Sequence, residues 1–380
     1  MALLLGPLEL IAAEPHVTDI AVTSDGRVWA DNGDGMHERF VDSGLKSPQV
    51  MRDFAVRLCA QLGRRLDDSC PIADASTPDG VRIHAVIAPI VSQGAAISIR
   101  LPDLSRATLD DLCANGTCPK QWEGLLQGFV ETRSTILISG GTGSGKTTLL
   151  KALLGYCGEG ERIVTVEEIR ELGSVPHKHC ESLVVREPNI EGAGAVTLED
   201  LVKATVRMRP DRIVLGECRG EEISDLLRAF NSGHRGGMVT IHADSIDRIP
   251  ARFSALGLLA GIQPQATALM AQDAFDCIIH MSRVKGKRFI SQIGYCCVDG
   301  RDNLEGRIMA RWDGKGEPWY SSGWGPWASR RAGTGVGNIQ CDTGIGAGNI
   351  SIQCDAGCHP TDCTTVLPAV RRSVVGMEGI

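Results

Sequence analysis

The chain has 380 residues, which is enough for two domains of ordinary size. Hydrophobic residues make up 43% of it and charged residues 22%, the balance of a globular protein. The net charge of −7 argues against a protein whose main task is to grip nucleic acid, because neutralising phosphates takes clustered Lys and Arg.

No apolar run approaches the ~20 residues of a membrane span. The start Met1–Leu5 is apolar, but it lacks the basic residues that begin a signal peptide, and Gly6 and Pro7 interrupt it. We therefore expect a cytoplasmic protein. Most of the 14 cysteines lie singly in apolar or mixed segments, as Cys59 and Cys277 do, which predicts buried, reduced thiols.

Residues 1–120 are predicted to form a separate, smaller α+β domain that ends in a linker. Strands are expected at 17–23, 27–30, 81–87, 90–91 and 95–100. An apolar residue at every fourth position from Val50 to Leu62 predicts a helix that ends at Gly63. Residues 101–119 carry turn-forming and helical residues, so we expect the linker and a short helix there.

A glycine-rich segment between an expected strand, 135–139, and an expected helix, 146–156, is the most specific motif in the chain. Strand, glycine loop and helix in this order are the context of a Walker A phosphate loop. The glycines let backbone N–H groups turn inward around phosphate oxygens. Lys146 can then reach the β- and γ-phosphates, and the Thr147 hydroxyl can ligate Mg²⁺. The residues expected to cradle ATP are Gly140, Gly141, Thr142, Gly143, Ser144, Gly145, Lys146, Thr147 and Thr148.

From 121 to 312, expected strands alternate with expected helices. The strands are 135–139, 162–166, 183–185, 212–215, 238–241 and 275–280, and the helices are 146–156, 198–208, 223–231 and 247–259. This alternation predicts an α/β domain with a mostly parallel sheet that helices cover on both faces. A last hairpin, 289–295 with 307–311, is expected to extend the edge of the sheet.

Two carboxylates, Glu167 and Glu168, follow the strand at 162–166 at its carboxyl end, where open parallel sheets bind ligands. They can hold a water on Mg²⁺ or orient the attacking water; the alternative is a solvated acidic turn. Glu217 stands where a Walker B acid belongs and is our candidate for positioning or activating water. Its alternative is a structural salt bridge. The expected Mg²⁺ ligands are Thr147, Glu168 and Glu217.

His234 and His242 stand on either side of the strand expected at 238–241. His242 follows this strand directly, so it can contact the γ-phosphate and distinguish ATP from ADP. A single histidine is more often structural, but two of them downstream of a Walker B strand favour a function.

The character of the chain changes after residue 312. Four tryptophans lie close together, at 312, 319, 324 and 327, and the glycine-rich segment 335–342 is nearly repeated at 346–355. We therefore expect residues 313–380 to form a poorly ordered tail rich in glycine and cysteine. A metal site in this tail is one alternative, although the spacing fits no zinc pattern well. The residues concerned are Cys341, Cys354, Cys358, His359 and Cys363. A translated artefact or a spliced reading frame is the other alternative.

Four segments follow the order of a Walker A loop, an acidic box, a Walker B strand ending in Gly-Glu and a histidine box, at 140–148, 162–172, 212–217 and 233–242. In this the chain resembles the secretion-superfamily ATPases, the hexameric motors of type II secretion, type IV pili and type IV secretion. Residues 188–201 and 207–212 look closest to the tight-adherence (Tad/Flp) pilus and conjugal-transfer subgroup. The resemblance covers about residues 5–312, with Glu168 standing where many members have Asp.

The resemblance implies a RecA-like P-loop NTPase domain, with ATP bound between the two domains and between subunits. It also implies completing arginines, from Arg82 and Arg100 of the N-terminal domain and from Arg207 and Arg209 toward a neighbouring subunit. An arginine that reaches the γ-phosphate in trans stabilises developing charge. The implied protein is a homohexameric motor that hydrolyses ATP at the cytoplasmic face of a bacterial inner membrane. Platform proteins would dock it there, and it would energise pilus assembly or protein secretion.

Two other classes remain open on the sequence. A nucleic-acid-stimulated motor with a RecA-like core would need a basic, aromatic strand-binding stretch, so the acidic balance favours no stable nucleic-acid partner. A nucleotide-switched regulator would bind ATP without useful turnover, and Glu217 is the residue that separates it from a motor.

Overall fold

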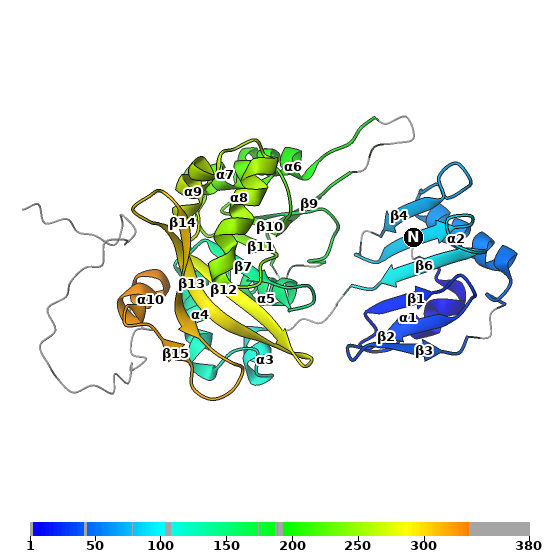
Figure 1. Ribbon diagram of the computed structural model, residues 1–380, viewed down its shortest axis with the longest axis horizontal. Coiled ribbons are helices and arrows are strands. Elements are labelled where there is room, and N and C mark those ends of the chain that lie inside the picture. The colour runs from blue at the N-terminus through cyan, green and yellow to red at the C-terminus, as the bar shows by residue number, and fades with distance from the viewer. Residues whose placement is uncertain are drawn as a thin grey trace, which may run out of the picture.

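The computed structural model describes residues 3–41, 44–77, 79–102, 108–173, 175, 177–186, 188 and 193–333. These residues form two units, each built on its own sheet, which follow one another along the long axis of the molecule (Figure 1). The last strand of the first unit ends at Arg100, and the first helix of the second begins at Leu109.

The N-terminal unit is an antiparallel sheet with the strand order β3-β2-β1-β6-β5-β4. Its elements are η1 (Gly6–Leu8), α1 (Glu9–Ala12), β1 (Asp19–Val22), β2 (Val28–Asp31), β3 (Met36–Arg39), α2 (Pro48–Gln61), β4 (Ile72–Ser76), β5 (Arg82–Ile87) and β6 (Ala95–Arg100). Burial alternates along β5 and β6, so that Ile83 and Ile97 pack with Met51 and Leu58 of α2. The helices therefore cover one face, and the other face is polar.

Two strands of this unit, β3 and β4, are absent from the sequence prediction. In β4 the buried residues are only Ala73 and Ala75, which give no β-branched signal. The strand predicted at 90–91 is wrong, because these residues lie in the loop between β5 and β6. Pro89 precedes them and has no N–H to donate to a ladder.

The second unit is a sheet with the order β15-β14-β13-β12-β7-β11-β10-β8-β9. Its elements are α3 (Leu109–Ala114), α4 (Lys120–Glu131), β7 (Ile136–Gly140), α5 (Lys146–Leu154), β8 (Ile163–Glu167), β9 (Cys180–Val184), α6 (Leu198–Thr205), η2 (Val206–Met208), β10 (Arg212–Cys218), α7 (Ile223–Asn231), β11 (Met238–Ile241), η3 (Ile246–Arg248), α8 (Ile249–Leu259), α9 (Pro264–Gln272), β12 (Cys277–Val284), β13 (Lys287–Val298), β14 (Leu304–Arg311), β15 (Trp319–Tyr320) and α10 (Trp324–Ala332). The strands from β12 to β9 are parallel, which confirms the predicted sheet, and β13 to β15 extend one edge in antiparallel fashion.

Helices cover both faces of this sheet (Figure 1). Ile136 and Ile138 of β7 pack in a cluster with residues of α4, α5 and α10. Leu137, between them in the sequence, packs in a second cluster with residues of α7, α8 and α9. Because successive side chains of a strand point to opposite faces, β7 lies in the middle of three layers, and the phosphate loop starts at its buried end.

The second unit begins earlier and ends later than the predicted boundaries at 121 and 312. Leu109 and Cys113 of α3 already belong to its core, and a disulfide joins Cys113 to Cys118 at the start of α4. Most other cysteines in the described ranges are buried free thiols, as expected.

The prediction that the ordered chain ends at 312 is wrong, because β15 and α10 follow. Trp324 and Trp327 of α10 are buried, and Trp327 meets Phe129 of α4 with ring centroids 5.9 Å apart. Trp324 and Trp327 thus continue the core instead of belonging to a tail. The repeat and the five tail residues considered for a metal site lie outside the described residues.

Gly128 of α4 marks the closest approach of α10, since a Cβ there would lie 2.3 Å from the carbonyl oxygen of Ala332. We expect Gly128→Ala to lower the free energy of unfolding by about 1–3 kcal/mol, because α10 must shift. A Cβ on Gly124, in the same helix, would meet nothing within 4 Å. Gly124→Ala is therefore the matched control, and it should stabilise by about 0.5–1 kcal/mol through helix propensity. Urea unfolding measures both; equal effects at the two positions would contradict the contact.

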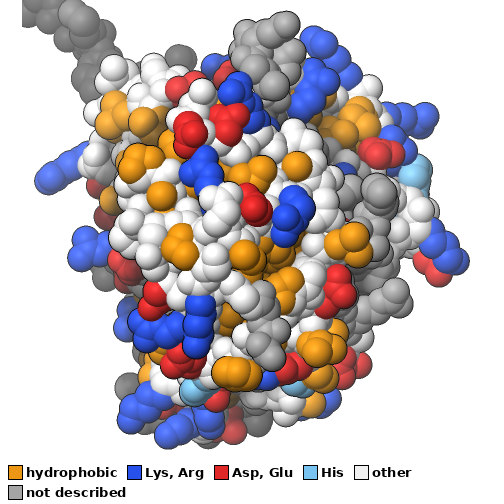
Figure 2. Space-filling model, turned by 90° about the vertical axis from the view of Figure 1, so that its right-hand side faces the viewer, with side chains coloured by type: hydrophobic (Ala, Val, Ile, Leu, Met, Phe, Trp, Pro, Cys, Tyr) orange, Lys and Arg blue, Asp and Glu red, His pale blue; other side chains and the backbone are white. Residues whose placement is uncertain are grey.

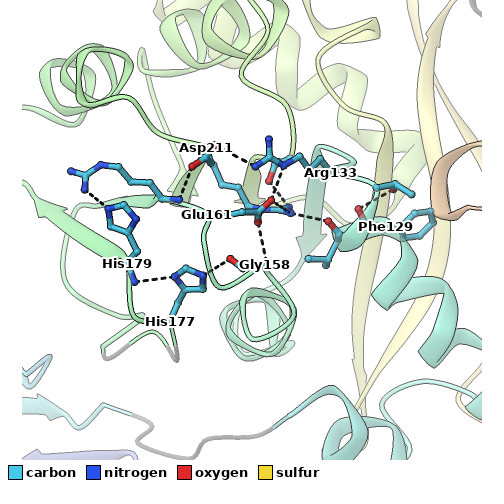
Figure 3. Close-up of polar contacts among 12 residues, drawn as sticks. Phe129, Arg133, Gly158, Glu161, His177, His179 and Asp211 are labelled. Carbon is cyan, nitrogen blue, oxygen red and sulfur yellow. Dashed lines mark hydrogen bonds and ion pairs between the residues drawn. The ribbon is translucent and has the colours of Figure 1, made fainter.

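A buried ion pair ties the amino ends of β8 and β10 together. Arg212 has only 1% of its side chain exposed and donates to both carboxylate oxygens of Glu161, at 2.5 and 3.1 Å. It also donates to the backbone carbonyls of Val130 and Gly236. Arg133 donates to the same Glu161 at 2.6 Å (Figure 3). This network holds the edge of the sheet opposite to the phosphate loop.

No helix in the described ranges is long and apolar enough to cross a membrane. Figure 2 shows the end of the molecule formed by the N-terminal unit, where apolar side chains lie in small groups separated by charged ones. The exposed large apolar side chains of this unit are Leu4, Leu10, Met36, Phe40, Val50, Ile72 and Ile90.

Candidate nucleotide-binding site

A cavity of about 440 Å³ lies between the two units, a size in the range of ligand pockets. The phosphate loop from Thr142 to Thr148 forms one wall. The polar face of the N-terminal sheet forms the facing wall, with Asp19, Asp31, Arg82 and Arg100 among its residues. Both units are therefore needed to complete the cavity.

The four charged residues of the facing wall form one row across the sheet. Asp31, Asp19, Arg100 and Arg82 are successive cross-strand neighbours on β2, β1, β6 and β5. Since they share a register, they project from the same face. Arg100 Nε donates to Asp19 Oδ1 at 2.9 Å. The structure thus brings Arg82 and Arg100, both candidates from the sequence, to the cavity of the phosphate loop.

The phosphate loop needs its glycines for space as well as for backbone conformation. Gly140 has φ 152°, and a Cβ there would lie 2.5 Å from the carbonyl oxygen of Met281 and 2.6 Å from Ser144 Oγ. Gly145 has φ 96° and caps the start of α5. The loop therefore folds tightly between β7 and α5 and lines the cavity, in the place where the N–H groups of a phosphate nest are expected.

Lys146 is buried, and its ammonium group is held by the loop itself. Nζ donates to the carbonyl oxygens of Gly140 at 3.0 Å and Gly141 at 2.9 Å. Burial lowers the pKa of Lys146, while the carboxylates of Glu217 and Glu171 oppose this effect. The lysine is thus positioned beside the nest.

Glu217 and His242 meet in front of Lys146. His242 Nε2 lies 2.8 Å from Glu217 Oε1 and 3.4 Å from Lys146 Nζ. Burial lowers the pKa of His242, and the charge of Lys146 lowers it further, against the opposite effect of Glu217. The neutral imidazole is therefore favoured, with its ring able to hydrogen-bond a carboxylate or a phosphate.

Arg219 is a residue of this group that the sequence analysis missed. Its guanidinium donates to Glu217 Oε2 at 2.7 Å and to Glu168 Oε2 at 3.0 Å. It thus joins the Walker B acid to the acidic box. Its place two residues after Glu217 was the available signal.

Glu167 is a buried residue of the acidic box whose side chain binds the backbone of the loop that follows β8. Only 2% of the residue is exposed, and Oε1 accepts the backbone N–H groups of Glu171 at 2.9 Å and Leu172 at 2.8 Å. Burial raises its pKa, and these two N–H groups act against the rise. Glu167 does not line the nucleotide cavity, so its position is that of a residue that shapes the loop.

Glu171, also missed from the sequence, is the acidic-box residue that reaches the cavity. It forms an ion pair with Arg82 of the N-terminal unit, and its Oε2 accepts a hydrogen bond from the Thr147 hydroxyl at 3.4 Å. One carboxylate therefore links the N-terminal unit to Thr147 of the phosphate loop. Its spacing of three residues from Glu168 was the signal in the sequence.

Oxygen donors that suit Mg²⁺ line the nucleotide cavity. The Thr147 hydroxyl and the carboxylates of Glu171 and Glu217 line the same cavity. Mg²⁺ in nucleotide sites takes one or two such ligands and completes its shell with phosphates and water, so these residues fit the ion. Glu168 is 56% exposed and does not line this cavity.

Three other candidates lie away from the cavity. Arg207 and Arg209 precede β10 at the amino edge of the sheet, whereas the phosphate loop lies at the carboxyl edge. Within one chain they do not meet the nucleotide. His234 lies near the carbonyl oxygen of Ala229, with Nδ1 at 3.1 Å, a contact local to the end of α7.

The parallel sheet, the phosphate loop and the acid that faces it define a P-loop nucleotide-binding protein with a RecA-like domain. The chain belongs to the type II/IV secretion system protein family, whose model matches residues 5–307. The resemblance stated from the motifs is thereby confirmed.

Individual relatives agree with this family. A Mycobacterium tuberculosis protein named for conjugal transfer is 39% identical over 315 residues, which cover 80% of this chain and 86% of that protein. PtlH, a type IV secretion system protein of Bordetella pertussis, is 33% identical over 61% of this chain and 74% of its own length. The solved structure of the ATPase DotB of Legionella pneumophila matches with a TM-score of 0.51 at 15% identity, covering 80% of each chain, which supports the fold alone.

Proposed function

We propose that the protein is a motor that hydrolyses ATP and energises pilus assembly or protein secretion at the cytoplasmic face of a bacterial membrane. The observation that carries this is the meeting of Lys146, Glu217 and His242 at a cavity closed by arginines of the other unit. An acid and a lysine at the carboxyl edge of a parallel sheet are the groups that phosphoryl transfer needs.

The chain's own residues divide the chemistry between them. The loop N–H groups and Lys146 hold the β- and γ-phosphates. Glu217 orients water and takes up its proton as the water oxygen bonds to the γ-phosphorus and the bond to ADP breaks. His242 lies beside Glu217 and Lys146. From there it contacts the γ-phosphate of ATP, which ADP lacks, and so distinguishes the two nucleotides. Mg²⁺, held by Thr147 with a carboxylate nearby, would neutralise phosphate charge when bound.

The motor action follows from the two walls of the cavity. Arg82 and Glu171 form an ion pair between the units beside Thr147. Because the phosphates of ATP add negative charge at this point, they attract Arg82 and Arg100 and draw the units together. Release of phosphate reverses that attraction, so each cycle of hydrolysis closes and opens the cavity.

The ring is part of the same proposal. Arg207 and Arg209 lie at the amino edge of the sheet, away from the nucleotide cavity of their own chain. In a ring they would contact the nucleotide that a neighbouring subunit binds. We propose a homohexamer that docks on membrane platform proteins. Size measurement with and without a non-hydrolysable ATP analogue tests the ring; a monomer at high concentration in both states would contradict it.

Replacing Lys146 by Ala tests the site itself. We expect ATP affinity to fall at least about a hundredfold and turnover to vanish, because a buried charge that pairs with two phosphates is lost. Calorimetric titration with the Mg²⁺ complex of an ATP analogue and a phosphate-release assay measure both. Lys120→Ala, at an exposed lysine at the start of α4 that does not line the cavity, is the control. Unchanged affinity and turnover in Lys146→Ala would end the proposal.

A further inference from the structure

Arginines dominate the positive charge of the nucleotide cavity. Those that line it in the described chain are Arg82, Arg100, Arg219, Arg283 and Arg288. The first three are each paired with a carboxylate. The last two, on the hairpin of β12 and β13, form no ion pair with any carboxylate that the structure describes. The hairpin therefore brings two positive charges to the cavity that form no close ion pair with a described carboxylate.

The hairpin touches the phosphate loop directly. Arg288 Nε donates to the carbonyl oxygen of Gly143 at 3.0 Å. A Cβ on Gly143 would lie 3.1 Å from Nη1 of Arg283, so that guanidinium also stands at the tip of the loop. Both side chains are exposed toward the cavity and are close to the loop that receives the phosphates.

An acid of the N-terminal unit lines the same cavity as the two arginines of the hairpin. Asp31 lines the cavity, and its Oδ1 accepts the N–H groups of Gly33 at 2.6 Å and Gly35 at 3.0 Å. The N–H of Gly33 holds the pKa of Asp31 below its ordinary value against the effect of burial, and the charge of Arg283 acts in the same direction. Asp31 is therefore negative at neutral pH and attracts Arg283.

We propose that Arg283 and Arg288 bind the polyphosphate of the nucleotide, and that Asp31 competes with this polyphosphate for Arg283. The inference rests on the proposed function and adds a third source of phosphate contacts, beside the loop and the N-terminal unit. Guanidinium groups suit this role because each offers several N–H donors to phosphate oxygens. Nucleotide binding would then replace the attraction between Asp31 and Arg283 by contacts of both units with the same phosphates.

Calorimetric titration of the full chain with the Mg²⁺ complex of a non-hydrolysable ATP analogue tests the arginines. We expect Arg283→Gln and Arg288→Gln each to weaken binding about tenfold, as the loss of a charge-assisted hydrogen bond does. Lys285→Gln is the matched control, since Lys285 lies in the turn of the same hairpin and does not line the cavity. It should bind as the wild type does.

Asp31→Asn tests the competition, and its expected effect has the opposite sign. Removing the competing charge should tighten binding about threefold to tenfold. The double variant Asp31→Asn with Arg283→Gln should bind no better than Arg283→Gln alone, because the acid then has no arginine to hold. Loss of a purely structural contact would not tighten binding, so this sign separates the two explanations.

The outcomes distinguish this inference from the proposed function. If Arg283→Gln and Arg288→Gln bind like the wild type while Lys146→Ala does not bind, the hairpin inference is wrong and the proposed function stands. If the wild type itself fails to bind the analogue, both are wrong. If Asp31→Asn binds no tighter than the wild type, the competition is excluded.

Discussion

Replacing Glu217 by Gln is expected to lower ATP turnover by about a hundredfold to ten-thousandfold while ATP affinity stays within a few-fold of the wild type. The amide keeps the size of the side chain, but it cannot take up a proton from water. Glu217 faces His242 and Arg219 rather than the backbone of the loop, so the phosphate nest does not depend on its charge.

Single-turnover hydrolysis and calorimetric binding of the ATP analogue separate the two quantities. Glu181→Gln, an exposed carboxylate on β9 away from the cavity, is the matched control and should change neither. Glu217→Gln also tests the alternative that the protein is a nucleotide-switched regulator. If cells that carry Glu217→Gln keep the activity that depends on this protein, ATP turnover is dispensable and the motor proposal fails.

The residues that lie within motifs could be predicted from the sequence. The residues of a phosphate loop are neighbours in the chain, and the local backbone sets their arrangement. Lys146, Glu217 and His242 stand at fixed places relative to strands, and the parallel sheet brings its strand ends to one edge. These three residues do meet, as their contacts show. For them, strand assignment alone was sufficient.

Other residues reach the cavity only because strands that are distant in the sequence pair with each other. The sequence alone did not predict their place at the cavity. Arg283 and Arg288 belong to an antiparallel hairpin at the edge of the sheet, and nothing in their spacing points to the phosphate loop. The row that places Asp31 beside Asp19 depends on the register of the N-terminal strands, which no motif specifies. In the same way, α10 was missed because Trp327 becomes a core residue only by packing against Phe129 of α4, which is far away in the sequence.

Replacing Arg212 by Ala is expected to lower the free energy of unfolding by about 3–5 kcal/mol, because it leaves the carboxylate of Glu161 without its buried partner. Glu161 has 14% of its side chain exposed, and two backbone carbonyls lose their donor as well. Arg133→Ala is the matched control: Arg133 also pairs with Glu161, but it is 44% exposed and should cost no more than about 1 kcal/mol. Urea unfolding at pH 7 gives both values, and equal losses would contradict the difference in burial.

The pH dependence of this pair supplies an independent check. Burial would raise the pKa of Glu161, but the hydrogen bonds and charges of Arg212 and Arg133 outweigh it and hold that pKa below its ordinary value. Such a group stabilises the fold above the pKa of the unfolded chain, which is about 4.3 for Glu, and this contribution is lost as pH falls through the lower folded value. The stability gap between wild type and Arg212→Ala should therefore be full at pH 7 and should shrink below about pH 4. A gap that stays constant down to acid unfolding would mean that Arg212 stabilises by packing and backbone contacts alone.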